Sequence, residues 1–424
     1  MSTCILWFRN NLRLSDNLPV ADAYANYERV IPVYLWEYPS DLPDRWGNEP
    51  MGVFRRAFLQ ESLEDLQEKL QEHDSNLLVV ENAEGKLVEL AKHFGAKAII
   101  GPSEMAYNEK KEEGALQDLA KNAGIQVKFF LERTLYSQKE LPFSLEQLPD
   151  VFTKFRKLVE KRSRVEFAIE EPEISPIGDV QGVVNTDWKV TPVDQDARTA
   201  VPFKGGSSAA WSQLDYYIWE NEFILDYKQT RNGLVGRDYS SKFSAYLALG
   251  CISAREIYKE VQRFEEEVKA NESTYWLFFE LLWREYFQWI ALLHGMDLFL
   301  PLGLQKEKPL KGGFNAKAFE RWKNGNTGDA FVDANMKELA ATGFMSNRGR
   351  QNVASYLVHD MGLDWRAAAA YFESQLIDYD PASNYGNWLY NAGRGNDPRP
   401  FRKFNTKFQA ERYDPEGTFV RQWS

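Results

Sequence analysis

Two hydrophobic periodicities alternate along the first 131 residues of the chain. Five short apolar runs are typical of buried strands, and they occupy residues 4–8, 30–36, 76–81, 96–101 and 126–131. Between these runs, apolar residues recur at the spacing of amphipathic helices. Regular alternation of strands and helices predicts a parallel sheet that is covered on both faces. No Gly-x-Gly-x-x-Gly follows the first run, so this Rossmann-like domain lacks the dinucleotide fingerprint.

The pattern changes twice further along the chain. Prolines and polar residues interrupt residues 132–200, where only the stretch 151–163 has helical spacing. Such a segment is typical of a long interdomain linker. After residue 200 strand signals disappear and helical runs dominate. We therefore predict an α/β domain over residues 1–131, a linker over 132–200 and an all-α domain over 201–424.

The charge distribution limits the binding partners. The net charge is −11, but residues 201–424 carry 27 basic and 28 acidic side chains, so the excess acidity lies in the first 200 residues. Wholesale electrostatic binding to nucleic acid is therefore disfavoured. A basic run between Arg394 and Arg412 suggests a local phosphate track, with a solvated surface as the alternative.

Several classes of protein are disfavoured by composition. No stretch approaches the roughly 20 apolar residues of a membrane span, and the first residues do not form a secretory signal. Two distant cysteines, Cys4 and Cys251, indicate a reducing compartment. The four histidines are scattered and offer no metal-ligand spacing. We expect a cytoplasmic protein without a metal centre.

A dense group of polar residues in an aromatic setting lies between residues 343 and 397. One helical stretch contains Asp378, Asp380, Asn384 and Trp388, and Arg350 lies on a helix upstream. Carboxylates are rarely buried without a partner, so this cluster suggests a polar cofactor inside a helical core. The alternative is a helical core whose polar groups satisfy one another.

A second candidate segment, residues 237–258, places a lysine among closely spaced hydroxyls. The residues concerned are Ser240, Ser241, Lys242 and Ser244. Hydroxyls and backbone N–H groups at helix starts bind phosphates well. An ordinary serine-rich loop is the alternative.

A third candidate segment, residues 279–287, is apolar on nearly every side. Glu280 and Arg284 lie four residues apart, which would suit an ordinary surface ion pair. The apolar surroundings favour burial instead, and a buried Glu280 needs a specific partner.

These three segments resemble the pocket of the photolyase and cryptochrome family. The likeness extends along the chain, from LWFRNNLRLSDN near the start to YDPEGTFVRQW at the end. Gln351 and Tyr390 stand where duplex-specific photolyases tend to have Met and Trp, and the linker LERTLYSQKELPF is similar to that of DASH cryptochromes. The chain is identified as a DASH-type member, and no signalling tail is expected after Ser424.

The resemblance implies that the all-α domain holds a U-shaped FAD. Arg350 and Asp378 would form a charge pair over the isoalloxazine, where Arg350 offsets negative charge on the flavin. Asn384 would meet the flavin N5 atom, and Asp380 would contact polar flavin or ribityl atoms. The implied FAD contacts are Tyr227, Ser240, Ser241, Lys242, Ser244, Trp276, Asn347, Arg350, Asp378, Asp380 and Asn384.

The resemblance also assigns a DNA-lesion site beside the flavin. Glu280 would bind the pyrimidine carbonyls and stabilise the arriving charge, and Trp283 would pack against the dimer. Gln351 and Tyr390 complete this site. Photolyases specific for the (6-4) photoproduct have two histidines where Asn347 and Gln351 stand, so that repair is disfavoured. The expected activity is blue-light splitting of cyclobutane pyrimidine dimers, preferentially in single-stranded or looped DNA, by a monomer.

A relay of tryptophans is a further implication of the resemblance. Trp388 and Trp365 match the inner two of three tryptophans that pass electrons to the flavin in this family. The outer one has no counterpart, because Gly312 occupies its place, with Phe314 nearby. We expect light-driven flavin reduction to proceed through these two tryptophans. The oxidising equivalent would then leave through another aromatic residue, or reduction would be less efficient. Ordinary core packing is the alternative for each tryptophan.

An antenna and two other functions complete the expectations. Glu104 is the closest match to a residue that contacts a methenyl-tetrahydrofolate antenna in the family; a solvated acidic helix start is the alternative. One functional alternative is a blue-light photoreceptor with little repair that signals through partners. The other is a non-photochemical flavin or nucleotide-binding protein on the same scaffold.

Overall fold

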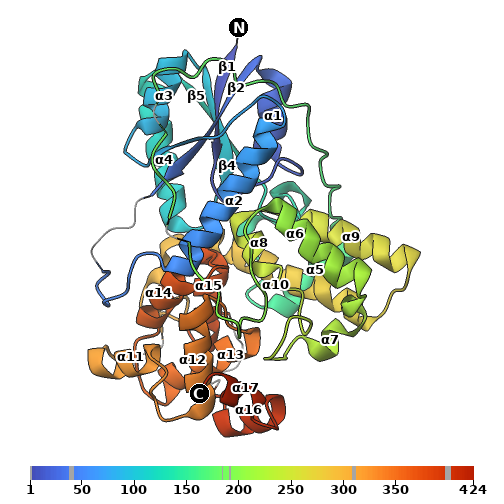
Figure 1. The fold of residues 1–424 in the computed structure, drawn as a ribbon, viewed down its shortest axis with the longest axis vertical. Helices are drawn as coiled ribbons and strands as arrows, with labels where there is room; N and C mark the ends of the chain where they lie inside the picture. The colour runs from blue at the N-terminus through green and yellow to red at the C-terminus, as the bar shows by residue number, and fades with distance from the viewer. Residues whose placement is uncertain (1, 38–42, 184, 191, 308–311, 397–402) are drawn as a thin grey trace.

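A parallel sheet domain lies above a helical domain in the computed structural model (Figure 1). The model describes residues 2–37, 43–183, 185–190, 192–307, 312–396 and 403–424. The strands are β1 (Thr3–Phe8), β2 (Arg29–Trp36), β3 (Leu78–Glu81), β4 (Ala98–Ser103) and β5 (Gln126–Leu131). They are all parallel, in the order β3-β2-β1-β4-β5. The five predicted strands are confirmed, with ends shifted by no more than two residues.

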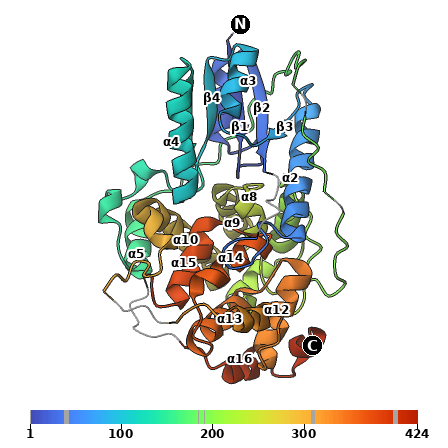
Figure 2. The ribbon, with the colours of Figure 1, turned by 90° about the vertical axis from the view of Figure 1, so that its left-hand side faces the viewer.

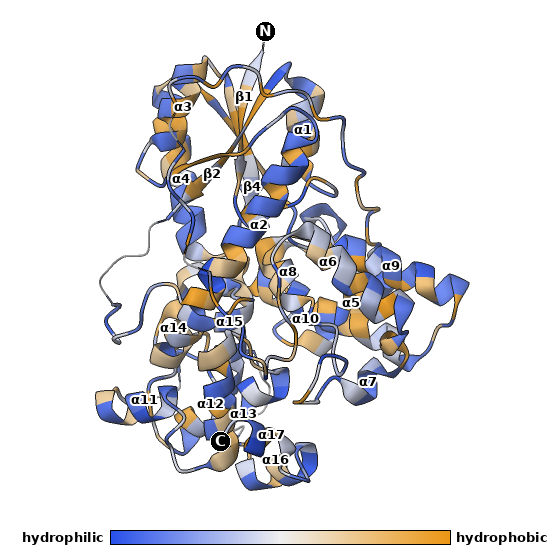
Figure 3. Ribbon diagram, in the orientation of Figure 1, coloured by the Kyte–Doolittle hydropathy of each residue, from blue (hydrophilic) through white to orange (hydrophobic). Residues whose placement is uncertain are grey.

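Alternate residues of each strand face opposite layers of helices. The helices are α1 (Leu18–Asn26), α2 (Val53–Gln71), α3 (Lys86–Phe94) and α4 (Tyr107–Asn122). Ile5 and Trp7 of β1 share a core with α3 and α4, whereas Cys4 and Leu6 share the other core with α1 and α2. Figure 2 shows the helices on either side of the sheet, and Figure 3 shows the apolar character of the strands. The prediction of a doubly covered parallel sheet is confirmed.

The segment 132–200 packs on both domains. It contains α5 (Phe152–Arg162), the helix predicted for this stretch, and two 3-10 turns at Gln138–Glu140 and Leu145–Gln147. Ile177 joins the core of the sheet domain, whereas α5 lies against a long helix of the other domain. The boundaries at residues 131 and 200 therefore stay a proposal.

Helices make up nearly all regular structure after residue 200. The α-helices are α6 (Ser207–Leu214), α7 (Tyr227–Thr230), α8 (Ser244–Leu249), α9 (Ala254–Glu267), α10 (Glu272–His294), α11 (Ala316–Lys323), α12 (Ala330–Thr342), α13 (Asn347–His359), α14 (Trp365–Gln375), α15 (Pro381–Asn391), α16 (Thr406–Tyr413) and α17 (Thr418–Gln422). The β pairing found in this domain, within the described residues, is one isolated bridge between Gly313 and Leu363. Among these described helices, none has the length and apolar character that crossing a bilayer requires.

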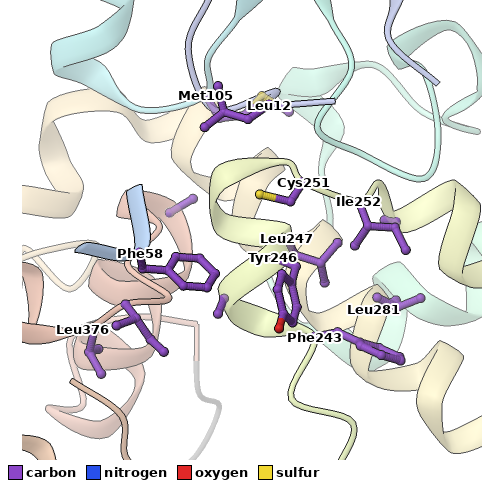
Figure 4. Packing of buried hydrophobic residues seen from close by; sticks show 14 of the residues in the cluster. Leu12, Phe58, Met105, Phe243, Tyr246, Leu247, Cys251, Ile252, Leu281 and Leu376 are labelled. Carbon is purple, nitrogen blue, oxygen red and sulfur yellow. The ribbon is translucent and has the colours of Figure 1, made fainter. Parts of the chain in front are cut away.

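A continuous apolar core joins the two domains. Figure 4 shows Leu12 and Met105, from loops of the sheet domain, close to Cys251 and the end of α8. Phe58 of α2 reaches the same core, and its ring lies 5.7 Å from that of Tyr246. This contact fixes α8, and hence the serine-rich segment before it, against the sheet domain.

Gly250 permits the closest approach between the domains. Its φ is +65°, in the left-handed region, and an added Cβ would lie 2.2 Å from the backbone oxygen of Asn10. We expect Gly250→Ala to lower the free energy of unfolding by about 3 kcal/mol, from left-handed backbone strain plus overpacking. Gly124→Ala is the matched control, because its φ is +70° and its Cβ would meet nothing within 4 Å. Urea unfolding measures the free energy of unfolding of both variants, and equal losses in the two would contradict close packing at Gly250.

Candidate functional site

A cavity of about 300 Å³ opens in the helical domain between α8, α10, α13 and α15. Its size is at the lower end of the range for small-molecule sites. The predicted residues in its wall are Tyr227, Ser240, Ser241, Lys242, Ser244, Glu280, Asn347, Arg350, Gln351, Asp378, Asp380, Asn384 and Trp388. The fold thus brings the three candidate segments together. The predicted residues outside the wall are Glu104, Trp276, Trp283, Trp365 and Tyr390.

Arg350 and Asp378 form the predicted charge pair. The Arg350 Nη2 atom lies 2.8 Å from Asp378 Oδ2, and its Nε donates to the backbone oxygen of Met345. The Asp378 side chain is 2% exposed. Its other oxygen, Oδ1, is buried and has no hydrogen-bond partner within the described residues. A buried carboxylate oxygen of this kind calls for a donor from a bound molecule.

Asp380 begins α15 and is held mainly by the protein itself. Its carboxylate accepts from the Ser383 backbone N–H, from Gln288 Nε2 and from Arg133 Nη2, at 2.7, 2.9 and 2.8 Å. Burial favours the neutral acid, but the guanidinium groups of Arg133 and Arg284 hold the pKa of Asp380 at about 2. The protein therefore holds this carboxylate ionised and fixes its position in the cavity wall.

The orientation of two side-chain amides follows from their partners. Asn384 faces the backbone oxygen of Ala369 at 3.0 Å, so its Nδ2 must point there and its Oδ1 is left to accept. Gln351 faces the Arg348 guanidinium at 2.9 Å, and a guanidinium only donates. The Gln351 Oε1 is therefore taken, and Nε2 is left to donate. The cavity wall carries one defined acceptor and one defined donor.

Lys242 brings a buried amine into the cavity wall. It is 3% exposed, has a φ of +59°, and donates to Ser240 Oγ at 2.9 Å. Within the described residues no carboxylate lies within ion-pair distance of it. Burial lowers the pKa of Lys242 well below its usual range. A buried lysine amine beside serine hydroxyls fits the phosphate-binding prediction for this loop, because a bound anion would favour its charged form.

Glu338 of α12 lies behind this loop and influences the charge of Lys242. It is 2% exposed, and its Oε2 has no hydrogen-bond partner in the described structure. Burial raises the pKa of Glu338 from 4.5 to about 8, although Lys242 and Arg350 oppose the rise. The raised pKa favours the protonated form of Glu338 near neutral pH, so Glu338 competes weakly with an anion for Lys242.

The raised pKa of Glu338 predicts a pH-dependent stability. Its folded pKa exceeds its unfolded value, so its stabilising contribution is complete below pH 4.5 and is lost as the pH rises towards 8. Glu338→Gln stays neutral at every pH. We expect its advantage in unfolding free energy over the parent to grow by about 3 kcal/mol between pH 5 and pH 8. The exposed Glu320→Gln should give a pH-independent difference, and a flat difference for Glu338→Gln would refute this assignment.

Glu280 pairs with a residue that the sequence analysis did not identify. The Arg231 Nη1 atom lies 2.7 Å from Glu280 Oε1, and Trp276 Nε1 donates to the same oxygen at 3.2 Å. Burial raises the pKa of Glu280, and the Arg231 guanidinium opposes that rise. The alternative of a Glu280–Arg284 surface pair is wrong, because Arg284 donates to the backbone oxygens of Arg133 and Leu247.

Trp283 and Tyr390 lie in one aromatic cluster. The Trp283 ring stacks on Phe152 of α5 at 3.7 Å with an interplanar angle of 13°, and meets Tyr390 edge-on at 5.7 Å. Trp283 is also three residues beyond Glu280 on α10, so both side chains share one helix face. Trp276 likewise stands outside the wall and acts through its bond to Glu280. The predicted lesion contacts of these residues stay a proposal.

The two predicted relay tryptophans are both buried. Trp388 is in the cavity wall, and its ring lies 5.1 Å from Phe372 and 6.3 Å from Trp322. Trp365 is 4% exposed and donates to the backbone oxygen of Pro301. At the position of the missing outer tryptophan, a Cβ on Gly312 would lie 2.6 Å from the backbone oxygen of Gly362. The backbone there is too close for any larger side chain.

Glu104 is buried, not solvated. It is 4% exposed, lies 3.4 Å from Arg133 Nε and accepts from Asn10 Nδ2 at 3.1 Å. The alternative of a solvated acidic helix start is therefore wrong. Since Arg133 also binds Asp380, one guanidinium links the predicted antenna residue to the cavity wall. A contact between Glu104 and a pterin stays a prediction.

The basic run between Arg394 and Arg412 falls partly outside the described residues, which exclude Arg399 and Arg402. Arg394 is only 6% exposed, and burial lowers its pKa. Lys403 forms an ion pair with Asp360 at 2.5 Å. The described part of this run therefore gives little support to a phosphate track.

Comparisons with known proteins agree with this architecture. Residues 4–174 match the family model described as DNA photolyase, and residues 276–424 match the FAD binding domain of DNA photolyase. A "Cryptochrome DASH" of Danio rerio is 46% identical over 99% of this chain and 82% of its own length. A cryptochrome crystal structure from Synechocystis is 42% identical with a TM-score of 0.94, covering 100% of this chain and 88% of the other.

The chain belongs to the DASH cryptochromes of the photolyase family. A photolyase structure from Sulfolobus tokodaii, whose title reports two FAD molecules, is 28% identical with a TM-score of 0.82 over 99% of this chain and 90% of that one. FAD is accordingly the cofactor of the helical domain.

The observed groups fit this DASH cofactor. Within the described residues, Lys242 lies buried in the predicted phosphate loop without a carboxylate partner, Asp378 Oδ1 lacks a donor, and Asn384 Oδ1 is left to accept. Which of the predicted residues touch FAD stays a proposal.

Proposed function

We propose that this DASH cryptochrome is a light-driven lyase that splits cyclobutane pyrimidine dimers, preferentially in single-stranded or looped DNA. The observation that carries the proposal is one shared cavity. Its wall contains the flavin-type groups Lys242, Asp378 and Asn384 together with Glu280 and the donor amide of Gln351. A substrate that reaches Glu280 would therefore lie beside the flavin.

The chain's own residues have distinct roles in this proposal. Reduced FAD, once bound and excited by light, supplies the electron for dimer splitting. Arg350 pairs with Asp378, and the pair balances charge beside the cofactor. Gln351 donates to a pyrimidine carbonyl, and Glu280 binds the base where charge arrives. Arg231 keeps Glu280 in place before DNA binds.

The preference for unpaired DNA follows from energy and charge. A lesion must leave the base stack to reach a buried flavin, which costs a few kcal/mol in a duplex and less in a single strand. The helical domain has nearly balanced charges, 27 basic against 28 acidic, so electrostatic attraction offsets little of that cost. Gln351 and Tyr390 also offer less apolar surface than Met and Trp would.

Light-dependent repair of matched substrates tests this proposal. The FAD-loaded protein is mixed with oligonucleotides that carry one thymine dimer, either single-stranded or in a duplex, in blue light and in the dark. We expect repair only in light, and faster on the single strand. Flavin that binds and responds to light without any repair would refute the lyase and favour the photoreceptor alternative. Faster repair of the duplex would refute the strand preference.

Three companion expectations are also proposals. They are a monomeric state, a cytoplasmic location and a methenyl-tetrahydrofolate antenna near Glu104. Plant relatives are named as chloroplastic or mitochondrial proteins, so the location needs its own test.

A further inference from the structure

Tyr385 occupies a central place among the aromatic residues behind the cavity. It lies on α15 three residues before Trp388, so the two side chains share one face, with Cβ atoms about 5–6 Å apart. Its ring also meets that of Trp365 on α14, at 6.3 Å and 78°. Tyr385 therefore neighbours both tryptophans of the predicted relay.

The hydroxyl of Tyr385 has a carboxylate partner. Its Oη donates to Glu373 Oε2 at 3.0 Å, and the tyrosine is 9% exposed while Glu373 is half-buried. Burial, and then the charge of Glu373, raise the pKa of Tyr385 above its usual value. The phenol thus keeps its proton at rest. It can pass that proton along an existing hydrogen bond when it loses an electron.

Other aromatic groups near the relay are less suited to electron donation. Trp46 packs on Phe314 at 5.0 Å near the vacant outer position, but the guanidinium carbons of Arg45 and Arg366 lie 4.5 and 5.6 Å from its ring. Two cations at this distance disfavour a positively charged indole. Tyr371 meets Trp322 at 6.0 Å, and among the described residues no carboxylate is hydrogen-bonded to its hydroxyl.

We propose that Tyr385, with Glu373 as its proton acceptor, takes over the role of the missing outer tryptophan. This inference rests on the proposed function, because the oxidant is the light-excited, oxidised flavin. Trp388 gives one electron to that oxidant and becomes a radical cation. One electron then passes from the Tyr385 phenol to the oxidised indole, either directly or through Trp365. The phenolic proton passes to the Glu373 carboxylate.

The products of this step are a neutral indole, a neutral phenoxyl radical on Tyr385 and a protonated Glu373. No positive charge is left in the core, so return of the electron is disfavoured. A soluble thiolate later supplies one electron to the phenoxyl and becomes a thiyl radical, and Glu373 returns the proton. Charge and atoms balance over the cycle.

Flash photolysis of the FAD-loaded full chain without DNA tests the inference. Flavin reduction is followed by absorbance, and the protein radical by electron paramagnetic resonance with unlabelled or ring-deuterated tyrosine. We expect tyrosine deuteration to narrow the radical spectrum of the parent. Tyr385→Phe should slow stable flavin reduction by about tenfold and remove the deuteration effect. Glu373→Gln should also slow it, because an amide does not take up the proton.

Tyr371→Phe is the matched control, since it removes the hydroxyl of another buried tyrosine on α14 and should keep the parent rate. Flavin content and unfolding midpoint are measured for each variant. If deuteration of tyrosine does not change the radical spectrum of the parent, the inference is overturned, whether or not the variants fold. A Tyr385→Phe variant whose flavin is reduced at the rate of the parent would also overturn the inference.

Repair by the parent after chemical reduction of the flavin separates the two claims. If the parent with chemically reduced flavin does not repair the dimer, the proposed function is refuted. The radical measurement tests the role of Tyr385 alone.

Discussion

Replacing Arg350 with methionine should leave a folded protein that retains little FAD. The change removes the cation 2.8 Å from Asp378 and leaves a buried carboxylate unpaired beside the cofactor. Breaking a buried pair in this way costs about 3–5 kcal/mol. If that cost falls on the FAD-bound state, the dissociation constant for FAD rises by roughly two to four orders of magnitude. Titration of the apoprotein with FAD measures the change.

Arg366→Met provides a matched control for this prediction. Arg366 and Asp364 form a similar pair at 2.6 Å, with side chains 15% and 8% exposed, outside the cavity wall. Its loss should lower stability without changing FAD affinity. Asp378→Asn and the double variant complete a cycle that isolates the pair. Equal FAD affinity in Arg350→Met and Arg366→Met would contradict the placement of the flavin.

Glu280→Gln should lower light-driven repair by about tenfold or more, because its carboxylate is proposed to act on the base as charge arrives. DNA binding in the dark should not weaken. The Arg231 guanidinium, 2.7 Å from Glu280 in the parent, loses its counter-charge and becomes available to a phosphate. The effect should therefore appear in the rate and not in the binding constant. Single-turnover repair and fluorescence anisotropy measure the two quantities.

Glu272→Gln serves as the control for this second prediction. Glu272 begins the same helix, α10, and pairs with Lys228, but its side chain is 81% exposed. We expect the Glu272→Gln variant to repair the dimer at the rate of the parent. A loss of DNA affinity in Glu280→Gln that accounts for the whole loss of repair would assign Glu280 to substrate binding alone.

The sequence predicted best what depends on local patterns. The five strands follow from apolar runs. The helical stretch begins later than predicted, because Asp380 caps the start of α15 at Pro381 and Asp378 lies before it. The Arg350–Asp378 pair was predicted because a buried carboxylate requires a partner, and the resemblance pointed to that partner. These features need only neighbours in sequence or one strong chemical rule.

Contacts set by the tertiary fold were missed. Arg231 lies 2.7 Å from Glu280, although 49 positions separate them and Arg284 is nearer in sequence. Arg133, in the predicted linker, joins Glu104 to Asp380 across the domain boundary. Periodicity within one helix does not report which face another segment covers. Such partners emerge only when distant segments pack together.

The most direct test of the account measures the fluorescence of the reduced flavin. The FAD-loaded protein is kept in the dark, mixed with a DNA strand that carries a lesion, and then excited. The account places the dimer at Glu280, in the same cavity as FAD, so electron transfer to it competes with emission. We predict strong quenching by a single-stranded oligonucleotide that carries one thymine dimer, and none by the undamaged strand of the same sequence. A dimer strand that binds, as judged by anisotropy, without quenching the flavin would contradict the shared cavity.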